Sequence, residues 1–516
     1  MALGTVGCGD STNAAGTDAG VDAGPPLTAV DFLHGVASGD PLTDRVILWT
    51  RVTPHAGVTA GTATVRWETS ATPDFAAVTH SGTFATTGDR DFTVKVDVTG
   101  LSANTTYYYR FSLGSTVSPV GRTRTAPAGS VSRVRFAIVS CASYAHGYFH
   151  AYRDLATRAD LDAVLFLGDY IYEFPNFLYG TVRQYDPPTQ IVSLSDYRRR
   201  YAWYRRDADL RAAHQQHPWI AVWDDHEFAD NAWTGGANNH DPNSEGPWAD
   251  RKAAAMKAYF EWMPIREQSP QAKIWRQFVY GDLVDLSMLD TRMWARSQQS
   301  VGEADPSPTR TLMGDDQEAW LLHNLSAATA RWKLIGQQVQ MSPIRPDVDL
   351  DAWEGYPASR TRLLQGIATM HVSNVVVLTG DIHSAWGMDV ALDPFTASAY
   401  NPATGTGSLA VEIITSAVTS PSDHPGSVVG PFMAANPQVR FGNPAQRGHC
   451  IVDCTLEREQ AAWYLLPEGS IEHRETQQLM FAEAWSTLNG ANHLTPGGDA
   501  AAPRADAPAL APAEPA

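Results

Sequence analysis

Four short stretches of the sequence combine residue types that bind metal ions and transfer protons. They are Ser-Cys-Ala-Ser at 140–143, Gly-Asp-Tyr-Ile-Tyr-Glu at 168–173, Asp-Asp-His-Glu at 224–227 and Gly-Asp-Ile-His-Ser at 380–384. Thiolate, phenolate, imidazole and carboxylate groups together form a strongly donating, anionic ligand set. If these stretches meet in space, they predict a metal centre.

Each stretch follows a short apolar run that is typical of a buried β-strand, at residues 135–139, 163–167, 219–223 and 372–378. Between the runs lie stretches of helical period, at residues 148–161, 248–262 and 316–330. This alternation predicts an α/β domain whose strands are covered on both faces. Because the carboxyl ends of such strands form a ligand crevice, we expect the four stretches to converge there.

The donor set suits two cations of different character. Phenolate, carboxylate and thiolate favour trivalent iron, Fe(III), whereas Asp169, Asp225 and Asp381 suit a hard divalent ion such as Ca²⁺ or Mg²⁺. If Asp169 bridges, two metals roughly 3.5–4 Å apart can clamp the attacking and leaving oxygens of a phosphoryl displacement. The sequence therefore predicts hydrolysis of a phosphate ester by a metal-activated hydroxide.

We expect no covalent phospho-enzyme, because the strand ends offer metal ligands but no Ser or Thr paired with a base. His226 directly follows Asp225 and is the expected catalytic residue. It would donate a proton to the leaving oxygen or stabilise charge there. Spacing alone leaves the choice of ligand open between Tyr170 and Tyr172, and between Asp224 and Asp225.

Arg292 stands at the end of another apolar run, residues 283–289. We expect it to bind the substrate, because a guanidinium can clamp a phosphate through two parallel hydrogen bonds. The alternative is a structural ion pair with Asp290 or with another nearby carboxylate.

The chain divides by composition into four parts. Residues 1–29 and 495–516 are rich in Gly, Ala, Asp or Pro and are expected to be a disordered leader and a disordered tail. Residues 30–127 contain short β-rich runs separated by turns, which indicates a β-sandwich. Within it, residues 101–110 resemble the tyrosine-corner strand of fibronectin type III domains. Residues 128–494 are expected to form the catalytic domain.

Charge and hydropathy exclude several functional classes. The 516 residues carry 38 Lys plus Arg against 56 Asp plus Glu, a net charge of -18, which disfavours recognition of nucleic acids or anionic membranes. The sequence contains no run of about 18 apolar residues, so it predicts no transmembrane segment. Gly7-Cys8 resembles the cleavage point of a bacterial lipoprotein signal, so a lipid tether at Cys8 is one expectation.

The same motifs, in order, carry a family resemblance. Cys141, Gly168-Asp-Tyr-Ile-Tyr172, Trp223-Asp-Asp-His-Glu227 and Gly380-Asp-Ile-His383 follow an N-terminal segment that opens with Phe32-Leu-His-Gly-Val-Ala-Ser-Gly-Asp-Pro41. This order resembles the PhoD-like alkaline phosphatase D family, a branch of the calcineurin-like metallophosphoesterases, over about residues 29–467. The resemblance implies a fibronectin- or Ig-like β-sandwich followed by a metallophosphatase β-sandwich flanked by helices.

The resemblance also implies the site and the activity. It assigns four residues to Fe(III) and three to Ca²⁺: Cys141, Asp169, Tyr172 and His383 for iron, and Asp169, Asp225 and Asp381 for calcium. Because the wider superfamily usually carries other residues at positions 141, 225 and 381, the identity of the second metal stays open.

The expected activity is alkaline phosphatase or phosphodiesterase action on small phosphate esters, by a monomer outside the cytoplasm. The protein would be periplasmic, secreted or tethered as a lipoprotein. The alternatives are a phospholipase D-type phosphodiesterase on the same scaffold, and a non-catalytic surface-binding protein.

Overall fold

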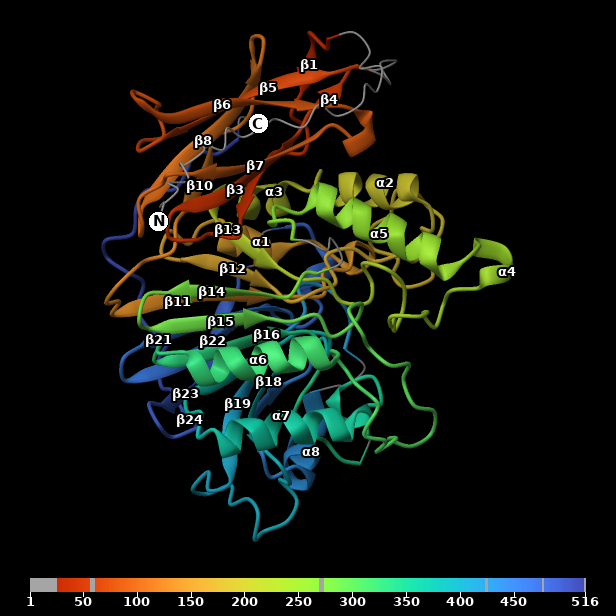
Figure 1. Ribbon diagram of the computed structural model, residues 1–516, viewed down its shortest axis with the longest axis vertical. Helices are drawn as coiled ribbons and strands as arrows, with labels where there is room; N and C mark the ends of the chain where they lie inside the picture. The colour runs from red at the N-terminus through yellow and green to blue at the C-terminus, as the bar shows by residue number, and fades with distance from the viewer. Residues whose placement is uncertain are drawn as a thin grey trace, which may run out of the picture.

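The computed structural model describes residues 26–55, 61–268, 273–346, 348–422, 426–475 and 478–514. They form the expected α/β fold, built on two large sheets (Figure 1). One sheet has ten strands in the order β24-β23-β22-β21-β11-β12-β13-β2-β3-β7, and the other has seven in the order β14-β15-β16-β17-β19-β18-β20. One apolar core contains side chains from both sheets, so the two form a β-sandwich.

The four predicted strands are all present and central. They are β11 (Arg133–Val139), β12 (Ala163–Phe166), β13 (Pro218–Ala221) and β17 (Val375–Thr379). Their continuous apolar runs have a physical reason. In β17, Val375 and Val377 pack under the helices, whereas Val376 and Leu378 join the core between the sheets. A strand that is buried on both faces needs apolar residues at every position.

Helices cover the outside of the sandwich. The helices α6 (Asp315–Ala327) and α7 (Pro357–Thr369) pack over the seven-stranded sheet. The others are α1 (His150–Leu155), α2 (Leu194–Tyr204), α3 (Ala208–Gln216), α4 (Pro242–Glu245), α5 (Trp248–Trp262) and α8 (Val429–Ala435). α1 is shorter than the helix expected at 148–161, because Asp160 and Asp162 bind Arg135 of β11 instead of continuing the helix.

The remaining strands of the two sheets complete the sandwich. They are β14 (Arg276–Tyr280), β15 (Val284–Met288), β16 (Trp332–Gln337), β18 (Ala385–Ala391), β19 (Ser408–Ile414), β20 (Val439–Asn443), β21 (Gly448–Thr455), β22 (Arg458–Leu465), β23 (Met480–Leu488) and β24 (Leu494–Pro496).

The N-terminal sandwich shares a sheet with the rest of the chain. Its strands β2 (Val36–Gly39), β3 (Arg45–Arg51) and β7 (Thr93–Thr99) extend the ten-stranded sheet, because β2 pairs in parallel with β13. The facing sheet contains β5 (Ala63–Ser70), β6 (Val78–Thr86), β8 (Thr106–Leu113), β9 (Thr116–Val117) and β10 (Gly121–Arg124). A small sheet pairs β1 (Val30–Asp31) with β4 (Thr53–Pro54).

Two local features support this arrangement. A Cβ on Gly39, at the β2–β13 junction, would lie 2.1 Å from the carbonyl oxygen of Pro264, so the close approach of the backbones requires glycine. The hydroxyl of Tyr107 accepts a hydrogen bond of 3.0 Å from the backbone N–H of Ser102, which is the contact that a tyrosine corner makes.

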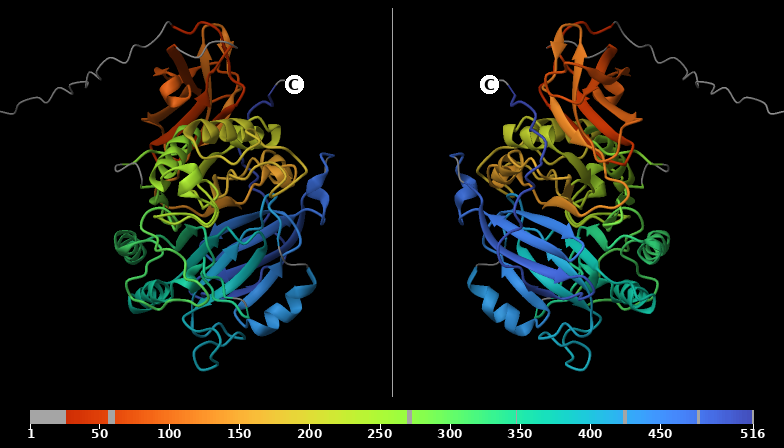
Figure 2. Two further views of the ribbon diagram at one scale, coloured as in Figure 1. Left: turned by 90° about the vertical axis from the view of Figure 1, so that its right-hand side faces the viewer. Right: turned by 90° about the vertical axis from the view of Figure 1, so that its left-hand side faces the viewer.

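The C-terminal segment differs from the expected disordered tail. Residues 497–514 run along the molecule toward the C-terminus (Figure 2) and contact side chains of β11 and α3. Buried side chains hold its backbone: Gln216 both donates to and accepts from Ala511, and Arg135 donates to the carbonyl oxygen of Ala502. The tail is therefore ordered by hydrogen bonds from distant residues, which its composition does not reveal.

The expected leader falls almost wholly outside the described residues, as does Cys8. Within the part of the chain that the structure describes, no helix is long and apolar enough to cross a bilayer.

Candidate metal centre

The predicted ligand residues converge at the carboxyl ends of β11, β12, β13 and β17, as the sheet topology requires. Three groups of side chains place their ligand atoms within 4.8 Å of one another. The groups are Cys141, Asp169 and His383; Asp169, Asp225 and His226; and Asp224, Asp225 and Asp381. Asp169 belongs to two groups and Asp225 to two, so the three form one continuous cluster.

The backbone at these ligands is in an unusual conformation. Cys141, Asp169, Asp381 and His383 have φ angles of 59°, 62°, 62° and 58°, in the left-handed region that non-glycine residues seldom adopt. Such strained residues persist only where their surroundings hold them, and they concentrate at functional sites. Four of them in one cluster indicate that the turns are held in place to aim these side chains.

Gly168 explains how two of these turns come so close. Its φ angle is 113°, and a Cβ built on it would lie 2.3 Å from the Cβ of Asp224. Any side chain at this position would push the turn after β12 away from the turn after β13. Glycine is therefore required for Asp169 and Asp224 to join one cluster.

The first group has the contacts of a metal site. The Tyr172 hydroxyl lies 3.0 Å from Oδ2 of Asp169 and 3.4 Å from Nε2 of His383. The other ring nitrogen of His383, Nδ1, lies 2.7 Å from the carbonyl oxygen of Pro421. A hydrogen bond from Nδ1 leaves the Nε2 lone pair directed into the cluster, which is the usual support for a metal-binding histidine.

The sequence motifs did not include Ser420, which lies beside this group. Its hydroxyl is 2.6 Å from the Tyr172 hydroxyl and 2.9 Å from the carbonyl oxygen of Cys141. It links the turns that carry two predicted iron ligands. No residue near it in sequence carries a metal-ligand pattern, so only the folded arrangement shows its place.

The electrostatics of the cluster fit a cation. Burial raises the pKa of Asp169, Asp381 and Cys141 well above their ordinary values, and neighbouring carboxylates raise these pKa values further. Burial lowers the pKa of His383 to about 3, so its imidazole is neutral. These anionic groups repel one another when protein charges alone are present, and a bound cation would favour their ionised forms. The donor set therefore fits a bound metal cation.

His226 lies against the second group. Its Nδ1 is 2.8 Å from Oε2 of Glu173, its Nε2 is 3.8 Å from Oδ2 of Asp225, and its ring stacks on Tyr172 at 4.3 Å between centroids. Burial lowers its pKa, but Asp225 and Glu173 outweigh that effect and hold the pKa of His226 well above its usual value.

Arg292 lies within the acidic part of the cluster. Its buried guanidinium contacts Asp224, Asp225, Asp351 and Asp381. Asp290 accepts hydrogen bonds from the backbone N–H groups of Arg292 and Met293. The guanidinium of Arg292 is instead paired with other nearby carboxylates, which is the structural alternative that the sequence left open. The other oxygen of Asp224, Oδ2, is buried without a hydrogen-bond partner among the described residues, so a cation could bind there.

Glu227 and Asp351 also shape the site, although neither was among the predicted site residues. Glu227 accepts hydrogen bonds from the backbone N–H groups of Asp169, Tyr170 and Asp224, and so joins two ligand turns. Glu227 could have been found from the sequence, because it is the last residue of the Asp-Asp-His-Glu stretch. Asp351 lies in a loop after β16, where no motif marks it.

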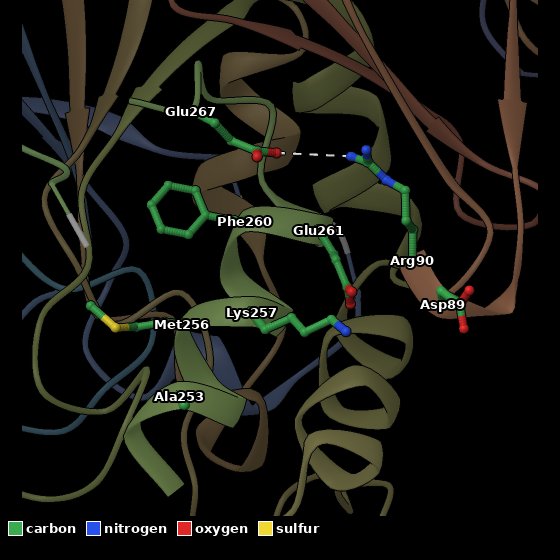
Figure 3. Close-up of a pocket in the computed structure, with 8 residues that line it drawn as sticks. All are labelled: Asp89, Arg90, Ala253, Met256, Lys257, Phe260, Glu261 and Glu267. Atoms are coloured by element: carbon green, nitrogen blue, oxygen red, sulfur yellow. Dashed lines mark ion pairs between the residues drawn. The ribbon is translucent and has the colours of Figure 1, made fainter. Parts of the chain in front are cut away.

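A separate pocket of about 660 Å³ lies between α5 and the turn η1 (Gly88–Arg90), as Figure 3 shows. None of the predicted ligands lines it. Two of its charged residues are paired within the protein: Arg90 Nη2 lies 3.8 Å from Oε1 of Glu267, and Glu261 binds Arg198 at 2.6 Å. The second pair joins α5 to α2.

Comparison with known proteins gives consistent matches. The family model of the PhoD-like phosphatase matches residues 136–463, and that of the PhoD-like phosphatase N-terminal domain matches residues 19–127. Alkaline phosphatase D of Bacillus subtilis (strain 168) is 40% identical over 401 residues, which are 72% of this chain and 68% of that protein. A solved structure described as "Structure of PhoD" is 33% identical, with a TM-score of 0.84 over 94% of both chains.

Proposed function

The chain belongs to the PhoD-like phosphatase family, and on that premise we propose that it hydrolyses phosphate esters at the candidate metal centre. The enzyme class is that of a phosphoric ester hydrolase, which the family match supports directly. The observation that carries the role of the centre is the meeting of four predicted ligands. Cys141, Asp169 and His383 lie in one group, and the Tyr172 hydroxyl contacts both Asp169 and His383.

We assign Fe(III) to Cys141, Asp169, Tyr172 and His383, because thiolate, phenolate and carboxylate suit a trivalent ion. We assign Ca²⁺ to Asp169, Asp225 and Asp381, whose oxygens suit a hard divalent ion. Asp224 lies in the same acidic group and has a free oxygen, so it is the additional candidate ligand. When bound, the cations would polarise the phosphate and lower the pKa of a water nucleophile.

His226 is the proposed catalytic residue. Its Nδ1 is held by Glu173, which leaves Nε2 on the side of Asp225 and the metal ligands. From there the imidazole can deliver a proton to the leaving oxygen or stabilise negative charge that develops on it. No covalent phospho-enzyme is part of the proposal, because we assign the side chains at the strand ends to metal binding and the nucleophile to a metal-activated hydroxide.

Arg292 is the proposed substrate-binding residue. Its Nη2 lies 3.1 Å from Oδ1 of Asp381 and 3.5 Å from Oδ1 of Asp225, so its donors face the proposed calcium ligands. A guanidinium in this place can bind a non-bridging phosphate oxygen. Its carboxylate partners Asp224 and Asp351 would keep it there while substrate enters and product leaves.

We also propose that the protein acts as a monomer outside the cytoplasm, where the resemblance places members of this family. Its substrates would be small phosphate esters, either monoesters or diesters. Sedimentation of the purified protein and fractionation of the cells that produce it would test these two statements.

The function is tested by measuring phosphate release from a monoester and alcohol release from a diester. Each rate is measured on the purified protein, after removal of metals by a chelator, and after Ca²⁺ and iron are restored. The proposal expects hydrolysis of at least one ester that chelation abolishes and the metals restore. Full activity after complete removal of metals, or no activity on either ester with metals bound, would contradict it.

The iron assignment has a separate readout. Phenolate or thiolate bound to Fe(III) gives visible charge-transfer absorption, so the purified protein should be coloured. Tyr172→Phe should weaken or shift the band, whereas Tyr179→Phe, which changes a neighbouring ring that stacks on Tyr172 at 5.3 Å, should leave it unchanged. A colourless, iron-free and fully active protein would exclude iron and leave ester hydrolysis standing.

A further inference from the structure

An apolar pocket of about 290 Å³ lies at the same edge of the seven-stranded sheet as the metal centre. Its floor is formed by Trp386 and Met388 of β18, which are 3% and 1% exposed. One wall is Phe432 of α8, whose ring lies 4.9 Å from that of Trp386 between centroids. The opposite wall is Ile344, in the loop after β16. These side chains enclose a hollow about the size of a small ring system.

The pocket and the metal centre share a turn. Ile382, which lines the pocket, stands between Asp381 and His383, which both belong to the metal-ligand cluster. They also share the loop after β16: Gln340 lines the pocket, and Asp351, further along that loop, binds Arg292. Ile382 is therefore the residue at which the pocket adjoins the turn that carries two predicted ligands.

The walls of the pocket are held in place by hydrogen bonds. The Asn436 side chain accepts from the backbone N–H of Arg345 and donates to its carbonyl oxygen, both at 2.8 Å, which fastens the end of α8 to the opposite loop. The indole N–H of Trp386 donates to Ser384 at 2.7 Å. The pocket is therefore formed before a ligand binds, as is usual for small-molecule sites.

We propose that this pocket is the binding site for an apolar ring carried by the phosphate ester, and that it gives the enzyme a preference for aryl over methyl esters. The inference rests on the proposed function of the metal centre. Its support is the continuity of the pocket with the ligand turn, its apolar floor, and a volume near the lower end for small-molecule sites. Among the described residues that line it, Arg345 is the only charged one, and none is a carboxylate that would repel the phosphate.

The test compares two phosphonates that cannot be hydrolysed, methylphosphonate and naphthylmethylphosphonate, by calorimetric titration into the metal-loaded protein. Burial of one naphthyl ring should make the aryl compound bind roughly tenfold or more tightly. Ala435→Trp, on the part of α8 that lines the pocket, should reduce that preference to less than about threefold. Ala434→Trp, on the same helix but outside the lining, is the matched control and should keep it.

A second variant controls for the case in which Ala435→Trp disturbs the packing of α8. Ile344→Glu places a charge on the opposite wall and should likewise remove the aryl preference, with affinity for methylphosphonate preserved. Equal affinities for the two phosphonates in the unmodified protein would overturn the inference. The inference would also be overturned if Ala435→Trp and Ala434→Trp showed the same preference for the aryl phosphonate.

Hydrolysis of a methyl ester is measured alongside the titrations. If that ester is hydrolysed but no aryl preference is found, the pocket proposal fails and the proposed function stands. If no ester is hydrolysed by the metal-loaded protein, the proposed function fails whatever the titrations show.

Discussion

Nδ1 of His226 lies 2.8 Å from Oε2 of Glu173, and this contact determines how the imidazole faces the metal ligands. Glu173 is fully buried and also accepts hydrogen bonds from the backbone N–H of Asp230 and the amide of Asn239. It is therefore held firmly, and it can orient the ring of His226. Nε2 is then the nitrogen left to meet a substrate.

Replacement of His226 by alanine should lower turnover by roughly 10²–10⁴, because a group that donates a proton to the leaving oxygen is lost. Metal content should not change, since the four iron ligands remain. Glu173→Gln keeps the shape of the partner and should cause a smaller loss. Turnover is compared with that of His323→Ala, which alters an exposed histidine on α6. Unchanged turnover in His226→Ala would remove this residue from the mechanism.

Arg292→Ala should destabilise the metal-free protein by about 3–5 kcal/mol, because Asp224 and Asp351 would keep buried charges without their cationic partner. Calcium should recover part of this loss, so the rise in melting temperature on adding Ca²⁺ should be larger in the variant than in the unmodified protein. KM for an ester should also rise if the guanidinium binds phosphate. Equal calcium shifts in both proteins would contradict the proposed closeness of Arg292 to a calcium site.

Stability at alkaline pH should depend on Glu459. This residue of β22 is buried, neither carboxylate oxygen has a hydrogen-bond partner among the described residues, and burial raises its pKa to about 8. Since the folded-state pKa lies above the unfolded value, the stabilisation is complete below about pH 4.5 and is lost as the pH rises to about 8. At about 1.4 kcal/mol per pKa unit, the loss amounts to several kcal/mol.

Glu459→Gln should therefore remove most of this pH dependence. Unfolding by denaturant at pH 5 and at pH 9 would measure it, with Glu457→Gln, an exposed neighbour, as the matched control. If the slope of stability against pH is the same in Glu459→Gln as in the unmodified protein, the assigned pKa is wrong.

Removal of residues 500–516 should lower the free energy of unfolding by about 2–5 kcal/mol, because buried hydrogen-bond donors would lose their acceptors. Arg135 is one of these donors, and Gln216 would lose both of its contacts with Ala511. Turnover of the folded protein should stay the same, since no predicted ligand contacts this segment in the described structure. Gln216→Ala should show part of the same loss. An unchanged unfolding curve for the shortened chain would contradict this role of the tail.

Local patterns in the sequence predicted the strands well, and the residues proposed as ligands lie close together. β12, β13, β17 and the second half of β11 are apolar runs because they are buried on both faces, and this pattern is visible without knowledge of the fold. The ligands follow the strand ends directly, so their meeting point follows from the topology of a parallel sheet. The family resemblance rests on the same motifs, which occur in the same order along the chain.

The rest depends on contacts between distant segments. The tail has a disordered composition, and it is held in place by residues far from it in the sequence, such as Gln216, about 300 positions earlier. β2 and β13 share one sheet through two paired positions, and the close approach of the backbones there requires glycine at position 39. Arg292 meets Asp351, whose loop has no motif. No short stretch of the sequence reveals any of these contacts.

An anomalous difference map from crystals of the purified protein, recorded on both sides of the iron absorption edge, tests the central claim most directly. The account predicts an iron peak bounded by Cys141, Asp169, Tyr172 and His383, with a second, lighter ion beside Asp225 and Asp381. A map from active protein with no metal among these side chains, or with its metal bound elsewhere, would contradict the account.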